Sequence, residues 1–248
     1  MSVAGRKVLI TGGGSGLGAE MARAFAAAGA EVVIAGRDGA RLEAVAGAAA
    51  AGAIRPVRAD VTREADVEAL FAAAGPVEIV IANAGAAASA PFGRTRLEDW
   101  EALLAVNLTG VFLTLRAALN QMGGWGRLIA VASTAGLRGY PYVAPYVAAK
   151  HGVVGLIRAL ALEVARREIT ANALCPGFLD TEMTGRSAAA IARETGRTEQ
   201  EARDALARHN PQRRLIRPAE VSAAALWLCA PGSEGVNGQA IAISGGEP

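Results

Sequence analysis

Apolar residues form seven short continuous runs along the chain, and alanine-rich stretches with helical periodicity separate them. The runs do not alternate with polar positions, which is typical of strands buried on both faces of a parallel sheet. The expected strands cover Lys7–Thr11, Glu31–Ala35, Ile54–Ala59, Val77–Ala82, Arg127–Ala132, Thr170–Leu174 and Gln239–Ile243. The expected helices cover residues 17–28, 40–51, 64–74, 97–122, 144–167 and 219–229.

This alternation of strands and helices indicates the fold class. Parallel neighbours in a sheet need crossover connections, which helices supply with right-handed geometry. We therefore expect a single α/β domain of the Rossmann type over residues 1–248, a doubly wound parallel sheet of seven strands with helices on both faces. One polar, arginine-rich segment, 185–214, interrupts the pattern. It is either a solvated helical insertion or a lid over the ligand crevice.

Composition argues against several classes of protein. A formal net charge of +2 over 248 residues leaves no dense basic face for nucleic acid. Cys175 and Cys229 lack CxxC spacing, and neither His151 nor His209 belongs to a ligand cluster, so no metal site is expected. The chain opens on a strand-like segment and has no long uncharged apolar run, so we expect neither a signal peptide nor a membrane span. A cytoplasmic protein is the expectation.

A glycine-rich turn follows the first strand and opens the first helix. Glycine allows a tight turn and a close approach of the backbone to a pyrophosphate, and the helix N-terminus offers free N–H groups to phosphates. This position between strand and helix favours a dinucleotide ligand over a flexible turn without one. The residues of the turn expected to bind it are Thr11, Gly12, Gly14, Ser15, Gly16, Leu17 and Gly18.

Tyr146 and Lys150 are four residues apart and fall on one face of a predicted helix. Only Lys7 and Lys150 are lysines among 25 basic residues, so the spacing is an improbable coincidence. A nearby ammonium lowers the pKa of tyrosine, ordinarily about 10, toward the range useful for proton transfer. Ser133, after the fifth strand, supplies a hydroxyl that can hold a substrate oxygen. Asn107 is an unfavourable residue inside an expected helix.

These motifs resemble the short-chain dehydrogenase/reductase family, in the family's order and over residues 5–246. The resemblance is carried by Thr-Gly-x-x-x-Gly-x-Gly after the first strand, Asn-Ala-Gly after the fourth, a serine after the fifth, and Tyr-x-x-x-Lys. It implies that Tyr146 transfers the proton and Ser133 polarises the substrate oxygen. Lys150 would lower the tyrosine pKa and hold the nicotinamide ribose, and Asn107 would join a water-linked proton path. Further implied cofactor contacts are Asp60, Val61, Asn83, Ala84, Gly85, Pro176, Gly177 and Thr181.

The end of the second strand bears on the choice between NADP and NAD. An acidic residue at this tip binds the ribose 2′-hydroxyl of NAD, whereas here the matching position is Gly36 and Arg37 follows it. A guanidinium suits a 2′-phosphate by charge and by its forked donors, which favours NADP. NAD is the alternative, because Asp38 could turn toward the ribose instead of capping the next helix.

General likeness within the family is nearest to 3-oxoacyl thioester reductases and 3-hydroxyacyl dehydrogenases. We expect an NAD(P)-dependent oxidoreductase that interconverts a ketone and a secondary alcohol, with a CoA or acyl-carrier thioester as the leading substrate. A small or cyclic secondary alcohol is the alternative, and a non-catalytic dinucleotide sensor is the interpretation from another class. The resemblance also implies a homotetramer formed through Glu220–Ala230 and the last strand, although Trp227 could instead cover the sheet of a monomer.

Overall fold

The computed structural model of the chain describes residues 3–50 and 53–247. Seven strands form one sheet, parallel throughout its paired neighbours, in the order β3-β2-β1-β4-β5-β6-β7. The strands are β1 (Lys7–Thr11), β2 (Glu31–Gly36), β3 (Ile54–Arg58), β4 (Ile79–Ala82), β5 (Gly126–Val131), β6 (Ile169–Pro176) and β7 (Ala240–Ile243). The predicted Rossmann-type fold class is confirmed.

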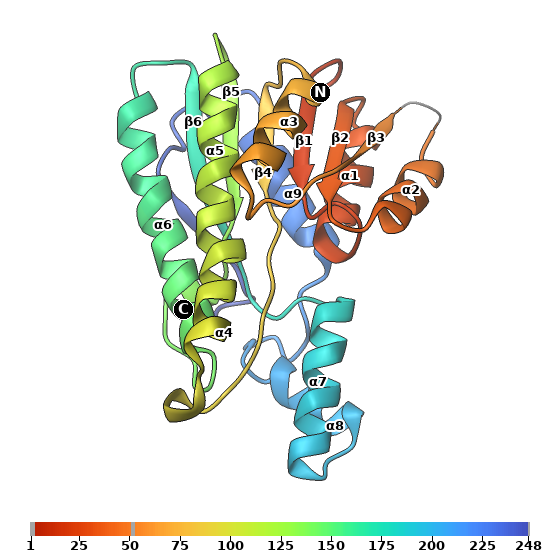
Figure 1. Ribbon diagram of the computed structural model, residues 1–248, viewed down its shortest axis with the longest axis vertical. Coiled ribbons are helices and arrows are strands. Elements are labelled where there is room, and N and C mark those ends of the chain that lie inside the picture. The colour runs from red at the N-terminus through yellow and green to blue at the C-terminus, as the bar shows by residue number, and fades with distance from the viewer. Residues whose placement is uncertain (1–2, 51–52, 248) are drawn as a thin grey trace.

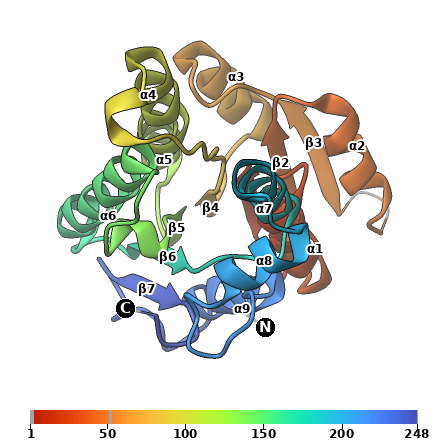
Figure 2. The ribbon, with the colours of Figure 1, turned by 90° about the horizontal axis from the view of Figure 1, so that it is seen from below.

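Helices cover both faces of this sheet (Figures 1 and 2). Their apolar faces build two cores: α1, α2 and α9 pack on one side, and α3, α5 and α6 pack on the other. The helices are α1 (Gly16–Ala27), α2 (Gly39–Gly47), α3 (Glu64–Ala74), α4 (Leu97–Leu104), α5 (Gly110–Gln121), α6 (Ala144–Val164), α7 (Glu182–Thr195), α8 (Glu199–Ala207) and α9 (Pro218–Leu228).

The expected elements all occur, with strand ends moved by one or two residues. Helix α2 is shorter than the expected 40–51, because it ends at Gly47 and glycine is a poor helix former. The last expected residue of that helix, 51, lies outside the described residues. Helix α6 ends at Val164 rather than at residue 167. These differences leave the order and direction of the elements unchanged.

The expected helix 97–122 is interrupted. A π-helical turn over Ala105–Thr109 separates α4 from α5. Inside it, the side-chain amide of Asn107 donates to the carbonyl oxygen of Leu103 at 3.0 Å, so a side chain competes with the backbone ladder at this turn. Such π turns are frequent at functional sites, and this one carries a predicted catalytic residue.

The stretch Leu97–Gln121 is also long and apolar enough, by length and composition, to cross a membrane, which corrects the expectation that the chain has no such segment. In the structure this stretch contacts α3, α6 and the sheet, and its π turn buries Asn107. These contacts hold the stretch against the sheet and its neighbouring helices.

Helices α7 and α8 project beyond the carboxyl ends of the strands (Figure 1). They share a small apolar core of their own, formed by Ala188, Ala202 and Leu206. Where the segment leaves and rejoins the body, Leu179 and Ile216 form a parallel bridge. The predicted insertion is therefore a compact helical pair whose two stems are joined at the base.

Candidate active site

The sheet order reverses between β1 and β4, and in such sheets the ligand crevice lies at the carboxyl ends of the strands around that point. Four predicted site residues lie at these ends: Thr11 on β1, Asn83 just after β4, Ser133 just after β5, and Gly177 just after β6. The fold therefore brings residues that are far apart in sequence to one edge of the sheet.

Thr11 and Asn83 tie the glycine-rich turn to the loop after β4. The hydroxyl oxygen of Thr11 accepts hydrogen bonds from the backbone N–H groups of Asn83 and Ala84, each at 3.1 Å. The Asn83 side-chain amide donates to the carbonyl oxygen of Thr11 at 2.9 Å. The Asn-Ala-Gly motif thus holds the glycine-rich turn in place through hydrogen bonds to Thr11.

Two glycines of the turn leave no room for a side chain. A Cβ on Gly12, which has a φ of +69°, would lie 2.8 Å from the Cα of Ala84. A Cβ on Gly18 would lie 2.2 Å from the carbonyl oxygen of Gly12. The turn and the first helical residues therefore pack backbone against backbone, which is the close packing that a pyrophosphate-binding turn requires.

The N-terminus of α1 is suited to an anion. Ser15 takes the N-cap position in an extended conformation, and Gly16, Leu17 and Gly18 form the first turn. Among the described residues, no side chain caps this helix, and its first turn carries no acidic residue. The free N–H groups and the positive end of the helix dipole are therefore available to bind a phosphate.

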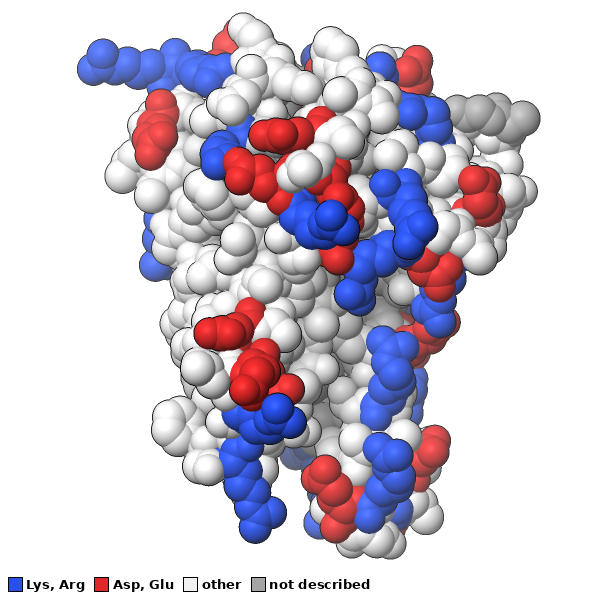
Figure 3. Space-filling view, viewed as in Figure 1, with Lys and Arg blue, Asp and Glu red and all other residues white. Residues whose placement is uncertain are grey.

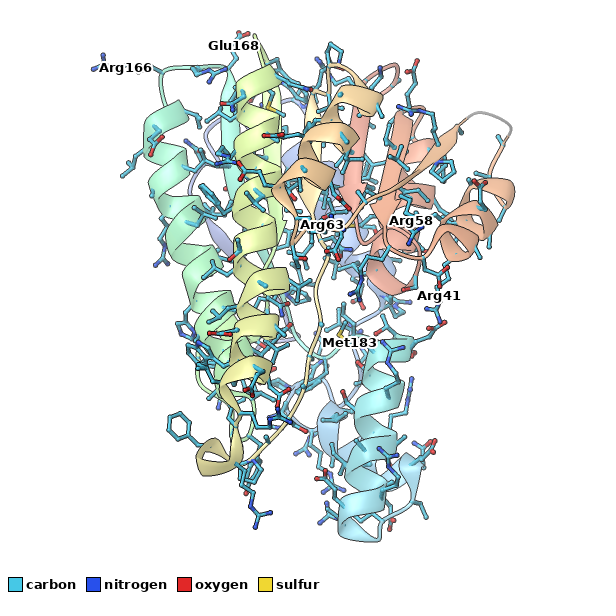
Figure 4. The ribbon with its side chains drawn as sticks, in the orientation of Figure 1. Arg41, Arg58, Arg63, Arg166, Glu168 and Met183 are labelled. Atoms are coloured by element: carbon cyan, nitrogen blue, oxygen red, sulfur yellow. The ribbon has the colours of Figure 1, made fainter. Side chains whose placement is uncertain are left out.

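A cavity of about 230 Å³ opens beside this turn. Its lining combines the turn with the end of β2 and the start of α2, through Gly12, Gly14, Ser15, Gly36, Arg37, Asp38, Arg41 and Leu42. Figure 3 shows basic side chains gathered beside α2 and continuing along α7, and Figure 4 shows Arg41 and Arg58 on this side of the molecule. Arg37 and Arg41 therefore lie beside the region expected for the adenosine ribose, and Arg41 is paired there with Asp38 and Glu182.

Asp38 turns toward the helix. Its carboxylate accepts a hydrogen bond from the backbone N–H of Arg41 at 3.1 Å and caps α2. The same carboxylate lies 3.5 Å from the Arg41 guanidinium. In this structure Asp38 therefore acts as the N-cap of α2, one of the two roles that the sequence left open, and the neighbouring Arg37 is exposed.

Asp60 and Val61 follow β3, as predicted. The Asp60 carboxylate accepts from the backbone N–H of Thr62 at 3.0 Å and from its hydroxyl at 2.8 Å. Burial raises the pKa of Asp60, but these hydrogen bonds and the charges of Arg37 and Arg63 outweigh it, so the net pKa lies below its usual value. Val61 is buried. Their contact with an adenine stays a prediction.

Helix α6 places the tyrosine and the lysine in the site. The Lys150 ammonium is buried, lies 5.5 Å from the ring centre of Tyr146, and donates to the carbonyl oxygen of Val131 at 2.8 Å. A hydrogen bond joins the side chains of Tyr146 and Ser133. The structure thus brings three of the four predicted catalytic residues together.

The two ionisable groups have shifted pKa values. Burial raises the pKa of Tyr146, and the hydrogen bond with Ser133 opposes that rise. This net direction is opposite to the lowering expected from Lys150. Burial also lowers the pKa of Lys150 to about 8, partly offset by the neighbouring Cys175. Burial therefore favours the neutral form of Lys150 relative to an exposed lysine.

Asn107, the fourth predicted catalytic residue, ties the π turn to the loop after β4. Its amide donates to the carbonyl oxygen of Ala86 at 2.8 Å, and its side-chain oxygen accepts from the N–H of Ala86 at 3.3 Å. A Cβ on Gly85 would lie 2.9 Å from that side-chain oxygen and 3.8 Å from the Lys150 nitrogen. Gly85 therefore lies between the side chains of Asn107 and Lys150, and a larger residue at this position would contact both.

The loop after β6 closes the site. Pro176 ends the strand, and the N–H of Gly177 donates to Ile243 at 3.0 Å. Thr181 is the N-cap of α7 and lies over the glycine-rich turn, where its methyl group is 3.6 Å from the position of a Cβ on Gly16. The predicted nicotinamide residues thus lie beside the predicted phosphate residues.

Sequence reasoning missed two residues near this site. Arg41 lines the adenosine-side cavity, and its position four residues after Arg37, on the first turn of the expected helix, is a signal that could have found it. Cys175 is buried beside Ser133 and Lys150, and burial raises its pKa to about 11. A cysteine inside an apolar strand carries no sequence signal of this placement.

The family model described as short chain dehydrogenase matches residues 6–192, which is more than half of the chain. The chain belongs to the short chain dehydrogenase family. It is therefore an oxidoreductase that uses NAD(P) and acts on CH–OH and C=O groups, as the predicted catalytic set indicates.

Relatives of this short chain dehydrogenase match over nearly their full lengths. It is 36% identical to the D-beta-hydroxybutyrate dehydrogenase of Cupriavidus necator, covering 98% of this chain and 97% of that protein. A variant of the actinorhodin polyketide ketoreductase, solved with NADPH, has a TM-score of 0.94 at 34% identity, covering 98% and 97% of the two chains. The 3-ketoacyl-(acyl-carrier-protein) reductase from Brucella melitensis, solved with NADH, has a TM-score of 0.87 at 34% identity, covering 99% of both chains.

Proposed function

We propose that this short chain dehydrogenase is an NADPH-dependent reductase of 3-oxoacyl thioesters. Two of the compared proteins are named as ketoacyl or polyketide ketoreductases, and the third is named for the corresponding hydroxy acid. The proposal covers a reaction that is reversible in principle, so a 3-hydroxyacyl dehydrogenase is the same chemistry run backwards. An NAD-dependent dehydrogenase of a small or cyclic secondary alcohol is the second candidate.

The observation that carries the cofactor choice is the arginine-lined cavity beside the glycine-rich turn. Arg37 and Arg41 line it, and the Asp38 carboxylate caps the N-terminus of α2 and pairs with Arg41, which also pairs with Glu182. A 2′-phosphate is doubly charged and accepts bidentate hydrogen bonds from guanidinium groups. A ribose hydroxyl would instead need a free carboxylate acceptor at the end of β2, where this chain has Gly36.

The residues of the site divide the work of ketone reduction. Bound NADPH supplies the hydride that the carbonyl carbon receives. Tyr146 donates the proton to the carbonyl oxygen, and Ser133, hydrogen-bonded to Tyr146, holds that oxygen in place. The Lys150 ammonium lies 5.5 Å from the ring centre of Tyr146, so its positive charge stabilises the phenolate that forms when Tyr146 loses its proton. Asn107 keeps a polar connection from this site toward the loop after β4.

We further propose that residues 1–248 work as one domain in which the 185–214 segment is the lid of the substrate crevice. Figure 3 shows the face of the molecule hollowed between the α4 side and α7. The joined stems at Leu179 and Ile216 support motion of α7 and α8 as a unit. The acidic partners of Arg186 and Arg203, which are Glu182 and Asp180, favour the alternative of a solvated insertion.

The proposed assembly is a homotetramer, in a cytoplasmic enzyme that acts without nucleic acid or membrane partners. Trp227 on α9 is 50% exposed and Leu162 on α6 is 80% exposed, so neither serves mainly to cover the monomer's sheet. Exposed large apolar side chains of this kind favour contacts between subunits. Light scattering on the purified protein tests this, and a monomer at micromolar concentration would contradict it.

The first experiment is a fluorescence titration of the purified protein with NADPH and with NADH, followed by addition of acetoacetyl-CoA. The proposal predicts clear preference for NADPH and its oxidation when the thioester is added. Preference for NADH would overturn the arginine argument and favour the second candidate. Binding of NADPH without turnover of any ketone or alcohol would leave the non-catalytic sensor as the better interpretation.

A further inference from the structure

A buried carboxylate outside the catalytic set lies beside the crevice. The Glu247 side chain is 1% exposed and lies four residues after β7. One of its oxygens accepts a hydrogen bond from the Tyr140 hydroxyl. The same oxygen is 3.9 Å from the guanidinium of Arg138 and 3.9 Å from the ring nitrogen of His209. Because burying a carboxylate is costly unless it is partnered, this placement calls for a role.

The other carboxylate oxygen faces the loop after β6. Among the described residues, none donates a hydrogen bond to it. It lies 3.5 Å from the position that a Cβ on Gly177 would take, so it rests against the backbone of a predicted nicotinamide residue. Ser244 holds the segment in this position, because its hydroxyl donates to the carbonyl oxygen of Glu247 at 2.6 Å.

Three aromatic rings from separate segments pack together, and two of them, Tyr140 and His209, approach this carboxylate. Tyr140 lies edge-on to Phe178 at 6.2 Å and to His209 at 5.7 Å, and Phe178 lies 5.5 Å from His209. We call Tyr140, Phe178 and His209 the ring wall. Contacts between two aromatic rings contribute only modestly to stability. A further interaction is therefore needed to keep the three rings of the wall in a single arrangement.

The ring wall adjoins the catalytic residues through the chain. The Tyr140 hydroxyl lies 2.8 Å from the hydroxyl of Thr134, which directly follows Ser133. Phe178 directly follows Gly177 and packs against the small core of α7 and α8. The wall therefore joins the loop that positions the substrate oxygen to the base of the helical pair.

The segment that carries Glu247 also seats the return of that helical pair. A Cβ on Gly245, which has a φ of +65°, would lie 2.0 Å from the side-chain oxygen of Asn210. Gly246 would place its Cβ 3.5 Å from Pro211. His209 thus comes from a stretch packed tightly on the residues just before Glu247.

We propose that Glu247 is a positioning residue that holds the ring wall against the substrate side of the crevice and so sets the affinity for the ketone. This inference rests on the proposed function. Burial, together with the hydrogen bond to Glu247, raises the pKa of Tyr140 to about 12, so its hydroxyl remains a donor over the working range of the enzyme.

The test compares Glu247→Gln and Glu247→Ala in the full chain with NADPH bound. Gln keeps an acceptor for the Tyr140 hydroxyl, so the KM for acetoacetyl-CoA should stay within about threefold of the wild type. Ala removes the acceptor and should raise that KM at least about tenfold, while kcat changes less than about threefold. Glu163→Gln is the matched control, because Glu163 is an exposed glutamate on α6.

Two outcomes would overturn the proposal. One is an unchanged KM in Glu247→Ala. The other is an equal loss of kcat and of NADPH affinity, which would indicate general damage to the fold. If Glu247→Ala does not fold, Tyr140→Phe removes the hydroxyl that bonds to Glu247 and contacts Thr134, and it should raise KM by about threefold or more with unchanged kcat. Wild-type KM in Tyr140→Phe would then contradict the proposal.

A second readout separates this inference from the proposed function. Hydrogen exchange of the NADPH-bound protein reports on residues 209–214 without any turnover. Loss of the anchor in Glu247→Ala should speed exchange in that segment and leave the glycine-rich turn unchanged, whereas exchange identical to the wild type would contradict it. If the wild-type protein reduces no thioester, the proposed function is wrong. Hydrogen exchange of residues 209–214 would still show whether Glu247 holds this segment in place.

Discussion

The carboxylate of Asp38 accepts a hydrogen bond from the backbone N–H of Arg41 at 3.1 Å and so caps helix α2. A capping carboxylate satisfies a helix N–H that is otherwise without a partner. It leaves Arg37 as the exposed charged residue that directly follows β2.

Arg37→Ala should weaken NADPH binding about tenfold to a hundredfold, because a charge-assisted hydrogen bond to phosphate is worth about 1.5–3 kcal/mol. NADH binding should change by less than about twofold, since NADH carries no 2′-phosphate. Fluorescence titration of both nucleotides measures this. Arg23→Ala is the matched control, an arginine on α1 paired with Glu20. Equal weakening of both nucleotides would contradict a role at the 2′-phosphate.

Tyr146→Phe should lower kcat by about a thousandfold, because general acid catalysis by a positioned side chain contributes about 10²–10⁴-fold. NADPH affinity should be nearly unchanged, since the substitution removes one hydroxyl and keeps the ring. Steady-state kinetics and a nucleotide titration on the same preparation check both points. Tyr142→Phe, at a tyrosine that is 64% exposed, is the control and should keep wild-type activity. Activity above about a tenth of the wild type in Tyr146→Phe would show that another group supplies the proton.

Local patterns predicted the parts of this site that depend on local geometry. The spacing of Tyr146 and Lys150 places them on one helix face whatever surrounds the helix, and the structure has them on α6. The order of motifs at strand ends predicted that Thr11, Asn83 and Ser133 would meet. Their shared position at one edge follows from the parallel sheet, and Thr11 and Asn83 are hydrogen-bonded there.

Other features depend on contacts that no short stretch of sequence contains. The apolar periodicity of 97–122 continues through the π turn, so only the amide contacts of Asn107 reveal the interruption. Glu247 meets Tyr140 across 107 positions of sequence. The pKa of Tyr146 also rises rather than falls, because the effect of burial outweighs the opposing hydrogen bond with Ser133.

Gly18→Ala should weaken NADPH binding at least about tenfold and lower the free energy of unfolding by about 1–3 kcal/mol, the usual cost of overpacking. The new Cβ would lie 2.2 Å from the carbonyl oxygen of Gly12 and 2.6 Å from the Asn83 amide, so the turn itself has to move. Nucleotide titration and urea denaturation measure the two effects. Gly155→Ala on α6 is the control, because its Cβ would have no neighbour within 4 Å among the described residues. That control should be neutral or more stable by up to about 1 kcal/mol.

Lys150→Met should change the pH dependence of stability in a defined direction. Burial lowers the pKa of Lys150 from 10.5 to about 8, so between these values the unfolded chain binds a proton that the folded protein has lost. Stability of the wild type therefore gains from this group as pH rises through that window, whereas below about pH 8 the buried ammonium costs stability. The variant has no such group and gains nothing.

The measurable quantity is the free energy of unfolding of Lys150→Met minus that of the wild type, from urea denaturation at a series of pH values. A shift of 10.5 to about 8 corresponds to about 3 kcal/mol, so this difference should fall by about that amount between pH 7 and pH 10.5. Loss of the hydrogen bond from Lys150 to Val131 shifts the difference by a constant and does not affect its slope. Titrating groups away from Lys150 are common to both proteins and cancel in the subtraction. Cys175, whose pKa Lys150 lowers, has a pKa of about 11 in the folded protein, above this range. A difference that stays constant over this range would show that the lysine keeps an ordinary pKa in the folded protein, and with it that the ammonium is not desolvated beside Tyr146.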